Sequence, residues 1–252
     1  MFFNKFSLVI FFFIVLNLNA QIINTESLRM VTDTSGWSGS IGLNINLTKN
    51  TKKIFKIDNR IHVQYKNAQH LILFMNDIDF EQLDGQNLIS NSVQHLRYNY
   101  KIKSKIYWEF FGQTQYNSIS KIDFRGLLGT GPRFKISNSE KYKFYLGSLI
   151  MYEYDRSKED IAITNKDLRW SSYLSFSLFP SKNTAIVSTT YYQPKLDGFN
   201  DFRISSESSI AVKIFEKLAF KSTFKFNFDK FPVEGIPKSQ YSFTNGLIYS
   251  FE

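Results

Sequence analysis

The three histidines, at positions 62, 70 and 95, are the side chains best suited to acid–base chemistry near neutral pH. In a membrane phospholipase, a histidine that activates a serine would be expected in a His-x-Ser pair, with an asparagine nearby. Here the second residue after each histidine is Gln64, Ile72 or Arg97. The sequence therefore lacks this pair, and a lipid-modifying enzyme is kept only as an alternative to a protein without catalysis.

Acidic, metal-binding and phosphate-binding patterns are equally weak. Glu159 and Asp160 form an acidic pair in an expected loop, but no histidine accompanies them as a proteolytic site would require. With no cysteine and three scattered histidines, the chain has no metal-ligand spacing. Gly126–Gly131 fall within an expected strand, not before a phosphate-binding helix. We predict no catalytic residue, no metal site and no cofactor.

A larger set of charged residues recurs at every second position, on the polar side of expected strands. Its members are Arg60, Arg97, Glu109, Asp123, Arg125, Arg133, Glu153, Arg169, Arg203 and Glu207. If this face lines the interior of a barrel, the charges form a cross-strand network of ion pairs that fills it, since buried charges must be paired. The alternative is a positively biased passage that selects small anions. The sequence leaves both possibilities open.

The elements that position these charges are β-strands, because apolar and polar residues alternate with a period of two. The clearest case sets Leu218, Phe220, Phe224 and Phe226 against Lys221, Thr223, Lys225 and Asn227. Alternation and turn residues predict twelve strands: 36–48, 53–66, 69–80, 91–102, 104–116, 120–136, 141–154, 167–179, 183–194, 201–215, 218–227 and 241–251. The sixth contains Gly129, Gly131 and Pro132, which predict a bulge or kink.

Residues 1–20 have the organisation of a secretory signal peptide. Lys5 precedes an apolar run from Leu8 to Leu16, and Ala20 stands before the expected cleavage site. The run is too short to span a bilayer, which takes about 20 apolar residues as a helix. We expect residues 21–252 to form one domain, in which 21–35 are a short periplasmic lead-in.

The connections predict the orientation of the chain. The expected loops 81–90, 155–166, 195–200 and 229–238 are long, whereas most of those on the opposite side are short. Long external loops and short periplasmic turns are typical of outer-membrane barrels. We therefore predict a closed antiparallel transmembrane β-barrel of about twelve strands, with both termini in the periplasm.

Alternation alone does not decide which face meets water, because a soluble barrel would turn its apolar face inward. Strands of about 12–14 residues are long enough to cross a bilayer, where roughly 9–11 suffice. The chain also contains 26 Phe, 14 Tyr and 3 Trp, many of them on the apolar face. These features favour apolar residues toward lipid, and a soluble periplasmic lipocalin-like barrel is the alternative.

The net charge of +9 is spread along the chain instead of concentrated in a basic arm. This distribution and the export signal argue against nucleic acid as a partner. We expect contacts with outer-membrane lipids and lipopolysaccharide, a monomeric state, and recognition by the barrel-assembly machinery through the last strand, which ends at Phe251.

Residues 95–134 resemble a specific family, the salt-induced outer-membrane proteins grouped as domain of unknown function 481. The resemblance is carried by Arg97, Tyr98, Tyr100, Trp108, Phe110, Gln113, Tyr116, Arg125, Leu127, Gly129, Gly131 and Arg133. It implies an outer-membrane barrel linked to osmotic or envelope stress, and it supplies no catalytic residues. The Asn-, Lys-, Ile- and Phe-rich composition resembles that of Bacteroidetes-type bacteria. The expected function is structural, or that of a narrow anion-biased channel.

Overall fold

The fold was examined in a computed structural model that describes residues 35–49, 51–137, 139, 141–157, 163–215 and 218–249. Within these ranges no helix has the length and hydropathy needed to cross a membrane. The expected signal peptide 1–20 lies outside the described residues, as do residues 21–34 of the lead-in, the pair Glu159 and Asp160, and Phe251.

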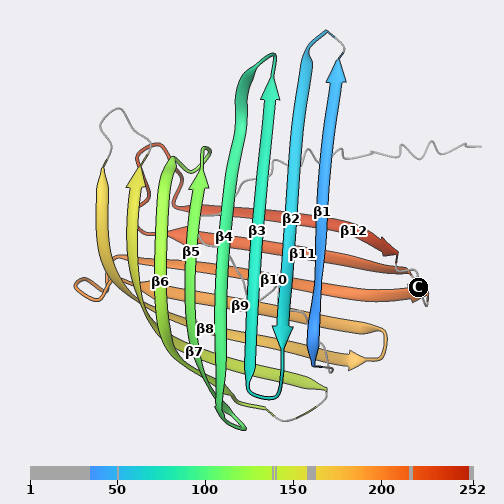
Figure 1. The fold of residues 1–252 in the computed structure, drawn as a ribbon, viewed down its shortest axis with the longest axis vertical. Helices are drawn as coiled ribbons and strands as arrows, with labels where there is room; N and C mark the ends of the chain where they lie inside the picture. Colours follow the sequence, from blue (N-terminus) through green and yellow to red (C-terminus); the bar gives the residue numbers. More distant parts are fainter. Residues whose placement is uncertain are drawn as a thin grey trace, which may run out of the picture.

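Twelve strands form a single antiparallel sheet in which each strand pairs with its neighbours in sequence (Figure 1). Their bounds are β1 Gly36–Lys49, β2 Lys53–Lys66, β3 His70–Leu83, β4 Gln86–Lys103, β5 Ile106–Asn117, β6 Ile122–Lys135, β7 Tyr142–Ser157, β8 Thr164–Ser181, β9 Thr184–Pro194, β10 Phe202–Phe215, β11 Leu218–Asp229 and β12 Ser239–Tyr249. The predicted all-β antiparallel class is confirmed.

The connection between β3 and β4 differs from the prediction of a long loop over 81–90. Leu83 pairs with Gln86, so only Asp84 and Gly85 form the turn. Both have positive φ, 49° and 83°, as a two-residue type I′ hairpin turn requires. Polar residues on the flanking strands were mistaken for a loop, and this segment gives no support to the long-loop argument for orientation.

The burial of the strands is inverted relative to that of a water-soluble protein. Arg133 and Glu153 are each 1% exposed, whereas Leu128 and Ile150 on the same strands are 65% and 47% exposed. The same alternation orients β3, for which the sequence did not predict a facing: Leu71, Leu73 and Met75 point inward, while Ile72 and Phe74 point outward. A mostly polar and charged interior under an apolar exterior is the arrangement of a membrane barrel, not of a lipocalin-like one.

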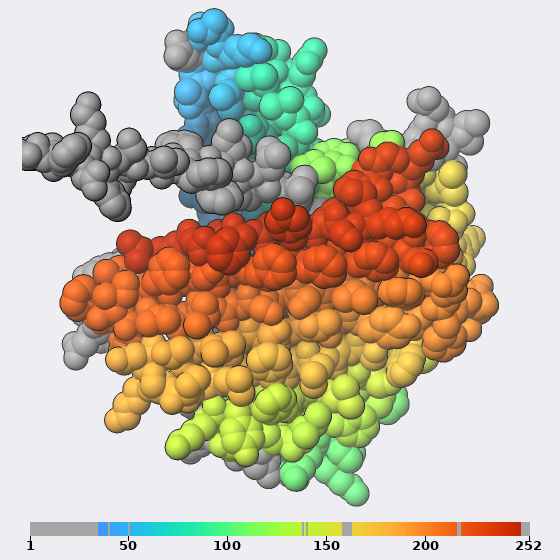
Figure 2. All heavy atoms as spheres, turned by 180° about the vertical axis from the view of Figure 1, so that it is seen from behind, coloured from blue at the N-terminus to red at the C-terminus, as the bar shows by residue number. Residues whose placement is uncertain are grey.

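The prediction of a closed barrel is not met, because no pairing joins β1 to β12 in the described residues. The sheet coils strongly, so that the first strands cross the last ones steeply instead of running beside them (Figure 1). Seen from behind, the β1–β2 hairpin projects beyond the wall formed by the carboxy-terminal strands (Figure 2). Closure requires the two edge strands to lie alongside each other in register, and this geometry does not provide that.

Gly131 and Pro132 of β6, where a bulge or kink was predicted, interrupt the pairing with β7 without adding a bulge. Pairing with β7 skips Gly131 and Pro132 but resumes in the same register, from Thr130 with Ile150 to Arg133 with Gly147. A Cβ at Gly131 would lie only 2.3 Å from the carbonyl oxygen of Ser148. The absence of a side chain therefore lets the backbones of β6 and β7 approach closely at this position.

Candidate functional site

The first part of the site is a buried ion pair between β5 and β6, closed by two tyrosines. Arg133 Nη1 lies 3.2 Å from Glu109 Oε1, and the two side chains are 1% and 0% exposed. Tyr173 of β8 donates its hydroxyl to Glu109 Oε2 at 2.6 Å. The guanidinium of Arg133 lies 4.1 Å from the ring centroid of Tyr145. This arrangement ties β8 to β5 across the interior and gives a buried charge both an ionic and an aromatic partner.

The second part is centred on Glu153 of β7. Glu153 Oε2 accepts a hydrogen bond from Arg203 Nη1 at 2.7 Å, and its Oε1 lies 3.5 Å from Arg169 Nε. Arg203 also donates to Asp229 of β11 at 2.8 Å, and Arg125 donates to Asp155 at 2.7 Å. Charge-assisted hydrogen bonds of this kind are short and strong. Residues from β6, β7, β8, β10 and β11 therefore meet at one point inside the sheet.

Lys195, in the connection after β9, extends this cluster toward the end of the strands. Its Nζ lies 3.0 Å from Asp167 and 3.1 Å from Asp201, and Arg169 also contacts Asp201 at 3.3 Å. Burial disfavours the charged form of Lys195, but the hydrogen bonds that it donates to the two carboxylates, together with their negative charges, outweigh burial and raise the pKa of this lysine.

The Glu153 cluster has no surplus of positive charge. Among the described residues it joins four cations, Arg125, Arg169, Lys195 and Arg203, to five carboxylates, those of Glu153, Asp155, Asp167, Asp201 and Asp229. The Glu109–Arg133 pair is itself neutral. A network of this composition favours a rigid filling of the interior over a field that attracts anions.

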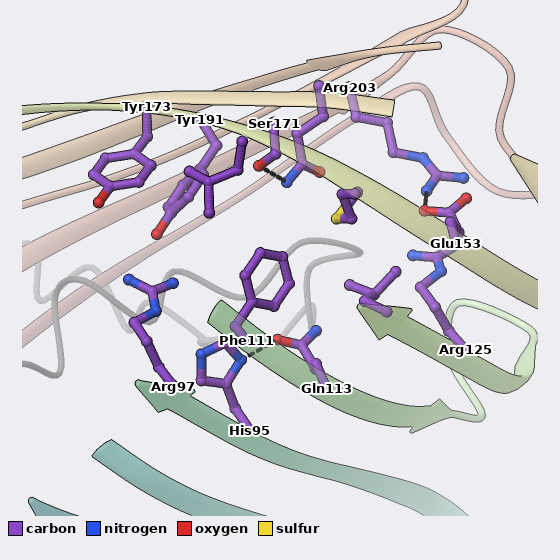
Figure 3. A pocket seen from close by; sticks show the side chains of 14 residues that line it. His95, Arg97, Phe111, Gln113, Arg125, Glu153, Ser171, Tyr173, Tyr191 and Arg203 are labelled. Carbon is purple, nitrogen blue, oxygen red and sulfur yellow. Dashed lines mark hydrogen bonds and ion pairs between the residues drawn. The ribbon is translucent and has the colours of Figure 1, made fainter. Parts of the chain in front are cut away.

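A small cavity remains between the two parts, and Figure 3 shows how side chains from opposite walls surround it. His95, Arg97 and Gln113 rise from β4 and β5, while Tyr173 and Tyr191 descend from β8 and β9. The free space is about 30 Å³. One water needs about 10–15 Å³ on this measure, so the cavity has room for a few waters.

The structure brings seven of the ten expected residues to this interior and places three elsewhere. The seven are Arg97, Glu109, Arg125, Arg133, Glu153, Arg169 and Arg203, all of them buried. Arg60 pairs with Asp79 on the less enclosed strands β2 and β3, and Glu207 lies 3.4 Å from the exposed Lys225. Asp123 sits in a bulge between Ile122 and Phe124, and it pairs with the exposed Arg156.

Several partners in the network were missed at the level of sequence. Asp155 and Asp229 lie two residues beyond the polar positions Glu153 and Asn227, so longer strands would have included them. The contact of Tyr173 with Glu109 could not be predicted from a local pattern, because the two residues are 64 positions apart in the sequence. A His62–Asp77 pair, with Nε2 to Oδ1 at 2.7 Å, was also unforeseen, because it depends on the register of β2 against β3.

The chain is similar in fold to solved structures with which it shares little sequence identity. The NanC porin matches with a TM-score of 0.50 at 9% identity, over 83% of this chain and 100% of that one. The CymD monoaromatic hydrocarbon channel matches at 0.47 and 8% identity, over 86% and 80% of the two chains. The translocator domain of the autotransporter NalP from Neisseria meningitidis matches at 0.46 and 9% identity, over 90% and 92%. No curated protein sequence matches the chain.

The sequence of the strands themselves identifies the family. A family model described as a protein of unknown function, DUF481, matches residues 39–251. This match spans all twelve strands except the first residues of β1 and includes both parts of the buried network. The chain thus belongs to the DUF481 family.

Proposed function

We propose that the protein is an outer-membrane β-barrel without catalytic activity, whose interior is held rigid by the buried ion-pair network. The inverted burial carries this proposal: Arg133 and Glu109 are fully enclosed, while Leu128 faces outward with 65% of its surface exposed. In water such a surface would be a large aggregation-prone patch. In the hydrocarbon core of a membrane, an apolar outer surface is the favourable arrangement.

In the membrane, the edges of the sheet must be paired. In the part of the chain that the structure describes, β1 and β12 carry unpaired backbone groups along one side, and outward side chains such as Trp37 (75% exposed) and Tyr241 (65% exposed) flank them. Open sheet edges do not occur in the hydrocarbon region, because each unsatisfied backbone group costs several kcal/mol there. We therefore propose that β1 and β12 pair within the bilayer and close the barrel, with both termini periplasmic.

A narrow channel is the second candidate, and the porin-like fold favours it. Against it stand the cavity of about 30 Å³ and the balanced charges of the Glu153 cluster. Planar-bilayer recording on the purified protein separates the two. Silence supports the filled barrel, discrete anion-biased conductance supports the channel, and hydrolysis of lipid in the same preparation would overturn both.

Membrane residence is tested first by fractionation and by electrophoresis with and without heating. The proposal predicts that the chain sediments with the outer membrane and migrates differently before and after boiling, as folded barrels do. Recovery of the chain in the soluble periplasm would contradict it.

The physiological role proposed from the family resemblance is adaptation to salt or envelope stress. It predicts that protein levels rise after a shift to high NaCl, and that a deletion strain grows more slowly there than its parent. The same proposal includes contact with lipopolysaccharide, a monomeric state, and assembly through the terminal segment that ends at Phe251. Equal growth of the two strains in high salt would remove the stress role and leave the barrel assignment intact.

A further inference from the structure

One row of polar side chains crosses the apolar outer face of β2–β5. Asn76 Nδ2 donates to Asn59 Oδ1 at 2.7 Å, Gln94 Nε2 donates to Asn76 Oδ1 at 3.1 Å, and Thr114 Oγ1 donates to Gln94 Oε1 at 2.7 Å. We call these four residues the amide row. Met75, beside Asn76, and both chain neighbours of Gln94 and of Thr114 are buried, so these three side chains point away from the interior.

An apolar groove begins at the amide row and runs along the outer face of β4–β7. Its first part has a volume of about 390 Å³, with Gln94 and Thr114 at one end and Phe74, Leu96 and Tyr152 along its sides. The second part, of about 630 Å³, shares Leu96, Gly112, Leu128 and Tyr152 with the first and continues to Phe110, Ile150, Leu168 and Thr130. The four strands lie side by side in Figure 1.

The far end of the groove is marked by Trp108, whose Nε1 donates to Thr130 Oγ1 at 2.8 Å. Trp108 and Thr114 are six positions apart on β5, which is about 20 Å at the usual rise of a strand. This length is comparable with the apolar band of a membrane barrel, about 25 Å tall. The groove thus extends from the polar row to the indole of Trp108, over a length that an extended acyl chain can occupy.

Two outward-facing glycines create the hollow. Gly112 pairs with Leu128 and Gly126 pairs with Thr114, so β5 and β6 present no side chain at these two positions. A Cβ at Gly112 would meet only Leu128 Cδ2, at 3.4 Å, which is an ordinary contact. A larger side chain at position 112 would therefore occupy the groove without forcing the backbone to move.

We propose that this groove binds one acyl chain of a glycerophospholipid, with the ester carbonyl at the amide row. The inference rests on the proposed membrane residence. Each amide NH₂ carries a second N–H, and Thr114 Oγ1 has acceptor lone pairs, so the row can donate to a carbonyl or accept from a hydroxyl. The residues lining the groove include no Lys or Arg, and a lipid bound through its phosphates would call for such cations. An ester at the row would satisfy polar groups that hydrocarbon leaves without partners.

The test counts lipids on the intact protein by native mass spectrometry, after purification in detergent and addition of dioleoyl phosphatidylethanolamine. Wild-type protein is expected to retain one phospholipid more per chain than either Gly112→Phe, which fills the groove, or Gln94→Leu, which breaks the amide row. Ser222→Val adds apolar bulk on β11, away from the groove, and should retain the wild-type number.

Equal retention by wild type and Gly112→Phe would overturn the proposal, as would a retained mass equal to lipid A or to a second copy of the chain. Heat-modifiable migration, measured on the same samples, keeps this result separate from the proposed function. A folded, membrane-derived protein that shows no difference in lipid count contradicts only the groove. A wild-type protein that is soluble contradicts the proposed function and the groove together.

Discussion

Two regions of the sheet carry the same alternating chemistry and enclose it to different degrees. Glu109 and Arg133, on β5 and β6, are almost completely buried, whereas the side chains of Arg60 and Asp79, on β2 and β3, are 41% and 26% exposed. Across the interior, β4 and β5 face β8 and β9 (Figure 3). The β2–β3 region is bordered by β1, beyond which the described residues contain no further strand. Alternation selects the face of a residue, and the coiling of the sheet decides whether that face is enclosed.

The difference has energetic consequences. An ion pair in an enclosed interior costs several kcal/mol when one partner is removed, because the other charge stays buried. An exposed pair is screened by water and contributes about 0–1 kcal/mol. The same kind of substitution should therefore have very different effects in the two regions.

The largest effect is expected for Glu109→Leu. This change leaves the guanidinium of Arg133 buried without its carboxylate and removes the acceptor of the Tyr173 hydroxyl, so the free energy of unfolding should fall by about 3–5 kcal/mol. Urea titration followed by heat-modifiable migration measures the loss. The double variant Glu109→Leu with Arg133→Leu should recover most of it, and a single variant as stable as wild type would refute the structural role of the pair.

A smaller loss is expected for Gly131→Ala. The new Cβ would meet the backbone of β7 at 2.3 Å, and crowding of this kind typically costs about 1–3 kcal/mol. Gly246→Ala on β12 is the matched control, because nothing lies within 4 Å of its Cβ position. The same urea titration compares the two variants. Equal stability of both would show that β6 and β7 do not approach each other as closely as described.

The smallest effect is expected for Arg60→Ala. Its pair with Asp79 is partly exposed to water, so the loss should be about 0–1 kcal/mol. A loss as large as that of Glu109→Leu, measured after reconstitution into a bilayer, would show that closure encloses β2 and β3 as fully as the middle of the sheet.

Much of the fold followed from the sequence because alternation is a local property. The residues of β2, Lys53–Lys66, were predicted without error, and β9 and β10 within one residue at their starts. The hairpin at Asp84 and Gly85 was missed, since polar residues on both flanks resembled a loop. Closure of the sheet depends on how β1 and β12 lie in space, and no local pattern encodes it.

The candidate site was predictable only in part. The sequence placed Arg125, Arg169 and Arg203 on the polar side of their strands, and the structure brings the three side chains together in the interior. Which carboxylate each one meets depends on register and coiling, as the contact of Arg203 with Glu153, 50 residues away, illustrates. Asp123 was expected on the same side of its strand as Arg125, but a bulge changes the direction of its side chain.

The assignment of the two faces is tested most directly by single cysteines, since the chain has none of its own. Leu128→Cys and Ile150→Cys place a fluorophore on the outer face, and Lys225→Cys places one on the charged inner face, where the side chain has room. In vesicles that contain brominated phospholipid, fluorescence at 128 and 150 should be quenched strongly and fluorescence at 225 should not. Quenching at 225 with none at 128 and 150 would contradict the account, because the charged face would then meet the lipid.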